Sequence, residues 1–150
     1  MNQVQPKYNF KTASLKDVIF FYESICATST IQPDIMVFNS KYKQRLKDKH
    51  CIQLLLEVDG KQAVGCVLAE VREQLSDANP YVEIQELYIF PKFRKLKAAD
   101  FLYTALEEKV RELKIYQLRV NCNINSTLNQ NFYVKKGFKI SKKQYKKEAF

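Results

Sequence analysis

Residues 81–113 carry the pattern that most constrains the fold: a strand, a basic turn and a helix in direct succession. The run YVEIQELYIF is rich in β-branched and aromatic residues and stops before Pro91, which is typical of a strand. From Ala98, apolar residues recur at helical spacing as far as Leu113. The turn between them, FPKFRKLK, contains four basic residues and no glycine. A helix N-terminus offers unpaired N–H groups and a positive dipole end, so a phosphate is one candidate ligand and a plain basic surface turn is the alternative.

The other elements follow from capping, periodicity and turn signals. Ser14 and Asp17 form an acidic capping box at the start of a helix. Asp59-Gly60 lies between two β-rich runs and predicts a tight hairpin. The polar segment 72–80 ends in a proline and is expected to be a loop. The expected strands are 8–14, 51–58, 61–71, 81–90, 116–124 and 138–147, and the expected helices are 14–27, 34–49, 98–113 and 125–136.

The order of these elements is β-α-α-β-β-β-α-β-α-β, without a repeat or a linker. Strands mixed with helices and at least one hairpin predict an α/β (α+β) sheet of mixed direction. A length of 150 residues suits a single domain, 1–150. No apolar run approaches the roughly 20 residues that cross a bilayer. The N-terminus does not resemble a secretory signal, so we expect a cytoplasmic protein without a membrane partner.

Charge and residue usage limit the kinds of site. The net charge of +9 attracts anions, but the aromatic residues do not alternate with Lys and Arg, which disfavours a nucleic-acid platform. The four cysteines form no CxxC pair, and the chain has one histidine, His50. We therefore expect no metal site and no Ser–His–Asp triad.

Two segments together resemble the GCN5-related N-acetyltransferase (GNAT) superfamily: ELYIFPKFRKLKAADFLYTALEEKV and NFYVKKGF. In the family's turn pattern, (Q/R)-x-x-G-x-(G/A), Arg94 matches the first position and Ala99 the last, while Lys97 replaces the glycine. The later segment matches at Phe132, Tyr133, Gly137 and Phe138. The resemblance covers nearly the whole chain. It implies a mixed, mostly antiparallel central sheet flanked by about four helices, and acetyl-CoA as the acetyl donor.

The resemblance also implies which residues hold the cofactor. Backbone groups of the central strand would pair with the pantetheine arm, and the turn and helix start would hold the pyrophosphate. Lys97 can donate its N–H if its φ is negative, whereas a positive φ costs about 1 kcal/mol relative to glycine. The residues so implicated are Leu87, Tyr88, Ile89, Arg94, Lys95, Leu96, Lys97, Ala98, Ala99, Ser126 and Tyr133.

The chemistry implied is direct attack of a neutral primary amine on the thioester. Tyr133 matches the family's usual general acid, because a phenol with a pKa of about 10 is protonated at neutral pH. Glu86 and Glu83 are the candidate bases. Their spacing places them on opposite faces of a regular strand, unless a bulge intervenes. We rank Glu86 first because it is closer to the turn, with a solvated strand carboxylate as the alternative.

The acceptor cannot be identified from the sequence. The resemblance places its pocket near residues 24–49 and 72–80. The lysines around Arg45 would repel a polycationic acceptor. An acidic small molecule, a protein N-terminus or an RNA-linked amine therefore suits this charge better as the acceptor. The competing function is a degenerate GNAT-fold module that binds CoA or another anion without transfer. Nucleic-acid binding ranks last, and both a monomer and a homodimer remain open.

Overall fold

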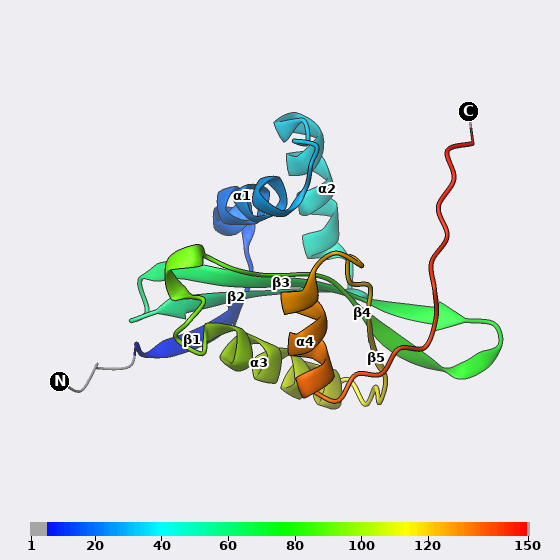
Figure 1. Ribbon diagram of the computed structural model, residues 1–150. Coiled ribbons are helices and arrows are strands. Elements are labelled where there is room, and N and C mark those ends of the chain that lie inside the picture. The colour runs from blue at the N-terminus through cyan, green and yellow to red at the C-terminus, as the bar shows by residue number, and fades with distance from the viewer. Residues whose placement is uncertain (1–5, 150) are drawn as a thin grey trace. The chain divides into compact units, whose positions relative to one another are not determined.

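The computed structural model describes residues 6–149 (Figure 1). The chain forms two compact units, Met1–Val120 and Asn121–Phe150. The second unit contains α4 (Thr127–Lys135). The first contains two short 3-10 helices, Leu15–Asp17 and Pro91–Phe93. Its strands and helices are β1 (Tyr8–Thr12), α1 (Val18–Thr28), α2 (Ile35–Lys47), β2 (Cys51–Val58), β3 (Gln62–Gln74), β4 (Asp77–Ile89), α3 (Ala98–Glu112) and β5 (Leu118–Val120).

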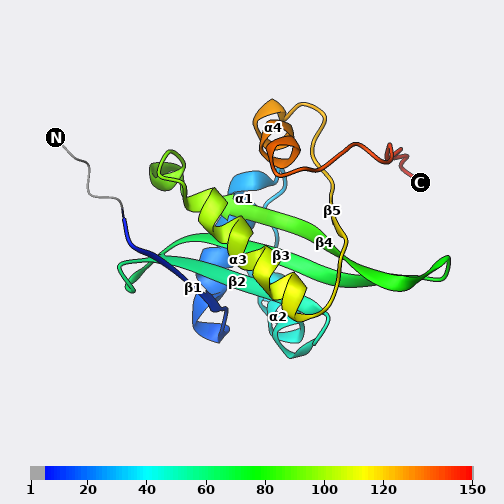
Figure 2. The same ribbon diagram turned by 90° about the horizontal axis from the view of Figure 1, so that it is seen from below.

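The first unit is a three-layer arrangement around one sheet of order β1-β2-β3-β4-β5. Neighbouring strands are antiparallel, except that β5 runs parallel to β4. Helices α1 and α2 lie on one face of this sheet and α3 crosses the other (Figures 1 and 2). The predicted class, a mixed and mostly antiparallel sheet with four helices, is confirmed.

Apolar side chains on both faces of the sheet form the core. On one face, Phe21 of α1 and Tyr42 of α2 pack with residues of β2, β3 and β4 that lie on the same face of the sheet, including Leu55 and Cys66. On the other face, α3 buries the apolar stripe that the sequence predicts, including Leu102 and Leu106. Burying one such leucine contributes about 1.5–3 kcal/mol, so these two layers fix the position of the sheet.

The local turn and capping predictions are confirmed. Asp59 and Gly60 have φ of 53° and 68°, as a tight hairpin requires. The Ser14 N–H donates to the Asp17 carboxylate at 2.8 Å. In the second unit Ser126 occupies the N-cap position of α4 without a side-chain capping hydrogen bond, and Gly137 follows the helix with a φ of 95°.

The prediction of a loop at 72–80 is wrong. Strands β3 and β4 run on to Gln74 and Asp77 and are joined by a short turn. Pro80 is tolerated inside β4 because the β3–β4 register shifts beside it, between Arg72 and Gln74, and β5 begins its pairing only at Val82. The missing N–H of the proline therefore costs no ladder hydrogen bond.

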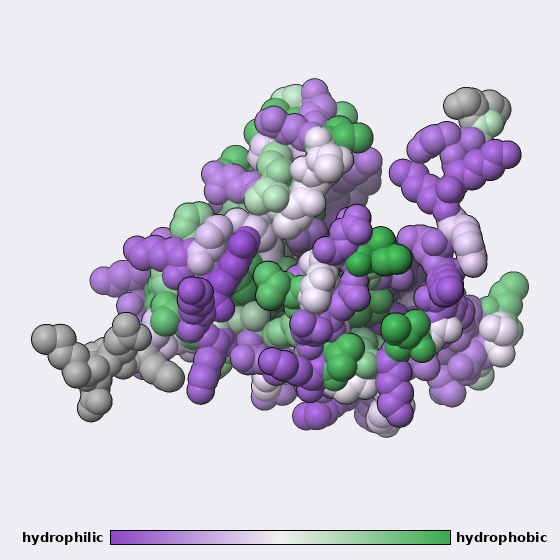
Figure 3. All heavy atoms as spheres, viewed as in Figure 1, coloured by the Kyte–Doolittle hydropathy of each residue, from purple (hydrophilic) through white to green (hydrophobic). Residues whose placement is uncertain are grey.

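The prediction of a last strand at 138–147 is also wrong, since no strand forms in residues 138–149. The segment alternates in sequence, but beyond Phe138 its apolar residues are exposed: Ile140 is 94% and Tyr145 is 89% exposed. Figure 3 shows the end of the chain as a run of hydrophilic residues. A strand of this kind needs a buried face to become stable.

Candidate functional site

The carboxyl-terminal part of β4 has a free edge within the described first unit. β5 pairs with β4 only from Val82 to Ile84. The Phe90 N–H donates to the Val64 carbonyl at 2.7 Å, and alternate residues of an antiparallel strand point their backbone groups to opposite sides. Leu87 and Ile89 therefore point their N–H groups away from β3, toward the free edge. An extended chain that carries amides can pair there as an additional strand.

The backbone of Tyr88 faces the other way. Tyr88 pairs in register with Cys66 of β3, so its N–H and carbonyl already have partners. On the free edge, the Ile89 carbonyl accepts from Arg94 Nε at 3.1 Å, which folds the side chain of Arg94 back onto the strand. Of the three strand residues predicted to contact the cofactor, Leu87 and Ile89 have backbone groups directed to the free edge.

In the turn after β4, the backbone conformation of Lys97 shows how the chain accommodates a lysine where the family has glycine. Lys97 is the N-cap of α3 and has φ 60° and ψ 17°, so it adopts the left-handed conformation that glycine favours. A lysine here costs about 1–2 kcal/mol relative to glycine. Ala98 and Ala99 begin the helix without a side-chain cap; Ala98 is buried, and the small side chain of Ala99 leaves room for close approach to the first turn. The turn thus retains the helix N-terminus that suits a phosphate.

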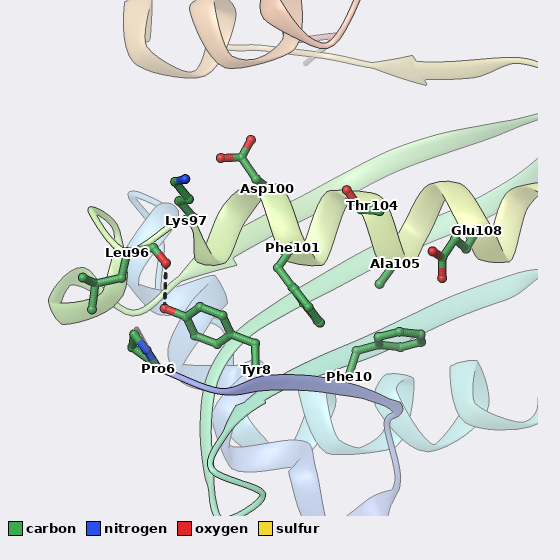
Figure 4. A pocket seen from close by; sticks show the side chains of 10 residues that line it. All are labelled: Pro6, Tyr8, Phe10, Leu96, Lys97, Asp100, Phe101, Thr104, Ala105 and Glu108. Carbon is green, nitrogen blue, oxygen red and sulfur yellow. Dashed lines mark hydrogen bonds between the residues drawn. The ribbon is translucent and has the colours of Figure 1, made fainter. Parts of the chain in front are cut away.

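Tyr8 of β1 fixes this turn from across the sheet. Its hydroxyl donates to the Leu96 carbonyl at 3.0 Å, and its ring packs against Phe101 with ring centroids 5.8 Å apart (Figure 4). Burial raises the pKa of Tyr8, which keeps the hydroxyl protonated as a donor. The sequence analysis missed this residue, because the contact joins positions 88 residues apart.

The same residues border a pocket of about 490 Å³ between β1 and α3 (Figure 4). Its lining is largely apolar, with Tyr8, Phe10 and Phe101 as the aromatic members. Strand β1 is at the opposite end of the sheet order from β5. The pocket therefore lies on the far side of α3 from the free edge of β4, and it touches the cofactor turn only through Leu96 and Lys97.

A bulge in β4 brings the two candidate bases onto one face. Leu68 pairs with Glu86 and Ala69 pairs with Ile84, so Gln85 is an extra residue on β4. Glu83 then pairs with Glu70. Because partners in register share a face, Glu83 and Glu86 both lie on the side of the sheet that carries α1 and α2. The regular-strand expectation of opposite faces does not apply here.

The two carboxylates differ in their surroundings. Burial raises the pKa of Glu86, and hydrogen bonding with the Thr28 hydroxyl partly opposes this rise. Glu83 instead lies 3.9 Å from Arg72 Nη2 in an ion pair. A base with a raised pKa is better matched to neutral pH. Glu86 is therefore the stronger candidate, as the sequence ranking has it.

Tyr133 and Ser126 belong to the second unit. Tyr133 is 8% exposed, and its ring lies edge-on to Phe132 and to Phe138, with each pair of centroids 5.2 Å apart. The Phe138 N–H donates to the Tyr133 carbonyl at 3.0 Å and closes the end of α4. The FY-x-x-x-GF pattern is thus a compact aromatic helix end. The predicted cofactor residues 87–99 form a continuous strand–turn–helix in the first unit.

The part of the chain that the structure describes has neither a metal-binding cluster nor a membrane-spanning helix. Residues 6–149 contain no group of three or more His, Cys, Asp or Glu side chains arranged to hold a metal ion. Within the same residues, no helix has the length and apolarity needed to cross a membrane. All four cysteines are free thiols, and burial raises the pKa of Cys66 to about 12.

The fold is shared with solved N-acetyltransferases. The aminoglycoside 6′-N-acetyltransferase of Acinetobacter baumannii superposes with a TM-score of 0.81 at 17% identity, over 96% of this chain and 99% of that one. An aminoglycoside N-acetyltransferase solved in complex with CoA superposes with a TM-score of 0.84 at 14% identity, over 100% of both chains. At these identities the likeness establishes the class of fold.

Sequence comparison establishes the family. The model of the acetyltransferase (GNAT) family matches residues 19–138, and the chain belongs to this family, whose members use acetyl-CoA. The aminoalkylphosphonate N-acetyltransferase of Salmonella typhimurium is 26% identical over 138 residues, which cover 92% of this chain and 89% of the relative. The predicted family is confirmed.

Proposed function

We propose that this protein is an acetyl-CoA-dependent N-acetyltransferase that moves an acetyl group to a primary amine by direct attack, with residues 1–150 acting as one catalytic domain. The observation that carries the proposal is the free edge of β4, which leads without interruption into the start of α3. An extended amide chain that ends in phosphates matches both parts of this surface.

Two groups of residues contact the cofactor: the backbone of β4 and the turn that leads into α3. Leu87 and Ile89 offer backbone groups to the pantetheine amides. The N–H groups at the start of α3, including that of Ala99, face the pyrophosphate, with Lys95 and Lys97 adding positive charge. Acetyl-CoA supplies the activated acetyl thioester. Holding both reactants on one surface provides much of the acceleration.

Glu86 takes the proton of the attacking amine, directly or through water. It lies on the sheet face that carries α1 and α2, on the strand whose edge receives the cofactor. Its raised pKa suits a group that must accept a proton near neutral pH. Glu83 is second in rank because its carboxylate is engaged in an ion pair with Arg72 and it lies farther from the turn along β4.

Tyr133 gives a proton to the departing thiolate. The support is the FY-x-x-x-GF pattern of the family and the ordered helix end that holds the ring in the second unit. Tyr133→Phe keeps the aromatic packing and removes the hydroxyl. We expect kcat to fall at least about 10-fold with an unchanged melting temperature. An unchanged kcat would exclude Tyr133 as the acid.

Titration calorimetry with acetyl-CoA, followed by an amine panel, tests the function itself. The panel begins with aminoalkylphosphonates, because a relative of 26% identity is named for them. We expect saturable binding and acetylation of at least one amine. Absence of binding at millimolar acetyl-CoA would contradict the proposal.

The second candidate is a GNAT-fold module that binds CoA or another anion without transfer. The positive φ of Lys97, where the family has glycine, favours it, because the residue strains the cofactor turn. Tight cofactor binding without acetylation across the panel would support this alternative.

A further inference from the structure

A row of side chains on the sheet face opposite α3 is unused by the chemistry proposed above. Arg72 of β3 pairs in register with Tyr81 of β4. Arg119 of β5 has its guanidinium carbon 3.7 Å from the centre of the Tyr81 ring. Partners in register share a face, so these three residues lie on the face that carries Glu83 and Glu86. We call Arg72, Tyr81 and Arg119 the polar row.

Arg119 is held in place by neutral groups. Its Nε donates to Gln117 Oε1 at 2.8 Å, and its Nη2 donates to Gln74 Oε1 at 3.5 Å. Among residues 6–149, no carboxylate lies within ion-pair distance of it. A guanidinium that is fixed by stacking and by amide oxygens is pre-organised, and its register partner Glu83 forms its ion pair with Arg72 instead.

The nearest carboxylates are engaged by other guanidinium groups. Arg72 Nη2 lies 3.6 Å from Glu70 Oε2 and 3.9 Å from Glu83 Oε1. Glu70 is shared with Arg45 of α2, whose Nη1 is 3.7 Å away. The carboxylates of Glu70 and Glu83 are thus engaged by Arg45 and Arg72, and neither is within ion-pair distance of Arg119.

We infer that the polar row binds an anionic group of the acceptor, and this inference rests on the proposed function. The anion is a phosphonate, phosphate or carboxylate, because a guanidinium fork matches two oxygens of such groups. The amine end of the acceptor then lies at Glu86. Tyr81 and Glu86 are two same-face steps apart on β4, roughly 13 Å between Cα atoms. Glu86 and the polar row lie on the same face of the sheet, so a zwitterionic acceptor can contact both with its two ends.

Binding of a bare anion tests the polar row without any turnover. We expect methylphosphonate to bind the wild-type protein in a calorimetric titration, and Arg119→Gln to weaken that binding about 10-fold or more. Arg111→Gln is the matched control, because Arg111 is exposed on α3 and pairs with Glu107. No methylphosphonate binding, or equal weakening by both variants, would overturn the inference.

Steady-state kinetics then tests the role in acceptor recognition. Arg119→Gln should raise KM for 2-aminoethylphosphonate about 10-fold or more and leave KM for propylamine and the Kd of acetyl-CoA unchanged. Arg119→Lys retains the positive charge without the guanidinium fork. Its KM for 2-aminoethylphosphonate should lie between those of the wild type and Arg119→Gln. β-Alanine in place of the phosphonate shows whether a carboxylate is the preferred anion.

The outcomes separate this inference from the proposed function. Equal losses for 2-aminoethylphosphonate and propylamine would assign Arg119 a structural role and overturn the inference. Bound methylphosphonate that Arg119→Gln weakens, without acetylation of any amine, would contradict the transferase and leave the anion site supported. The melting temperature of each variant verifies that it is folded.

Discussion

The cofactor turn and the acceptor face of the sheet are built by different means. The turn, residues 90–99, offers backbone N–H groups where α3 begins, so its side chains are largely replaceable; even Lys97 can occupy a glycine position. The acceptor face depends on side chains, which the bulge at Gln85 and the register of β5 bring together. Substitutions should therefore have small effects in the turn, unless they block the backbone, and large effects on the face.

The largest effect is expected for Glu86→Gln, which removes the base and keeps the shape. We predict that kcat falls about 100-fold or more while the Kd of acetyl-CoA is unchanged. Single-turnover kinetics and calorimetry measure the two quantities. Glu112→Gln, an exposed change on α3, is the control. A kcat within about 3-fold of the wild type would remove Glu86 as the base and break the contrast between the regions.

A smaller but clear effect is expected where a side chain blocks the turn. Ala99→Asp places a carboxylate at the start of α3, where it suits the helix dipole but repels a pyrophosphate. We predict that the Kd of acetyl-CoA rises about 10-fold or more without loss of thermal stability. Thr104→Asp, further along α3, should leave the Kd unchanged. An unaltered Kd for Ala99→Asp would place the phosphates elsewhere.

The raised pKa of Glu86 predicts a pH effect on stability. Because the folded protein binds this proton more tightly than the unfolded chain, the free energy of unfolding falls as pH rises through the folded pKa. Glu86→Gln removes this loss. Its melting temperature should exceed that of the wild type by about 2–4 °C near pH 8, with the difference shrinking toward about pH 4. A constant difference across this range would contradict the burial of the carboxylate.

The smallest effect is expected for Lys97→Gly. Glycine relieves the positive φ but gains freedom in the unfolded chain, so the net stabilisation is about 1 kcal/mol or less. If the lysine is merely tolerated, the Kd of acetyl-CoA stays within about 3-fold of the wild type. A marked loss of affinity would show that the ammonium replaces what the glycine provides, and would make the turn as dependent on side chains as the acceptor face.

The difference between the regions also explains what the sequence could predict. Leu87 to Ala99 are contiguous in the chain, so periodicity, capping and a family pattern identify them together. The bulge at Gln85, which aligns Glu83 with Glu86, depends on pairing with β3 and has no local signal. The contact of Tyr8 with Leu96 likewise joins distant segments and becomes visible only in the fold.

The same reasoning accounts for the two wrong secondary-structure predictions. Pro80 suggested a loop, but a register shift and the late start of β5 accommodate it within β4. The alternation in 138–147 suggested a strand, but Ile140 and Tyr145 are exposed and bury no face. In both cases the deciding factor is the tertiary surroundings of the segment, which local sequence does not reveal.

Amide hydrogen exchange at the end of β4 tests the central claim, that the free edge of this strand receives the cofactor. The N–H groups of Leu87 and Ile89 point to that edge, whereas the N–H of Tyr88 is bonded to β3 and is an internal control. Saturating CoA should slow exchange at Leu87 and Ile89 and leave Tyr88 nearly unchanged. Unchanged exchange at both Leu87 and Ile89 with CoA bound would contradict the account.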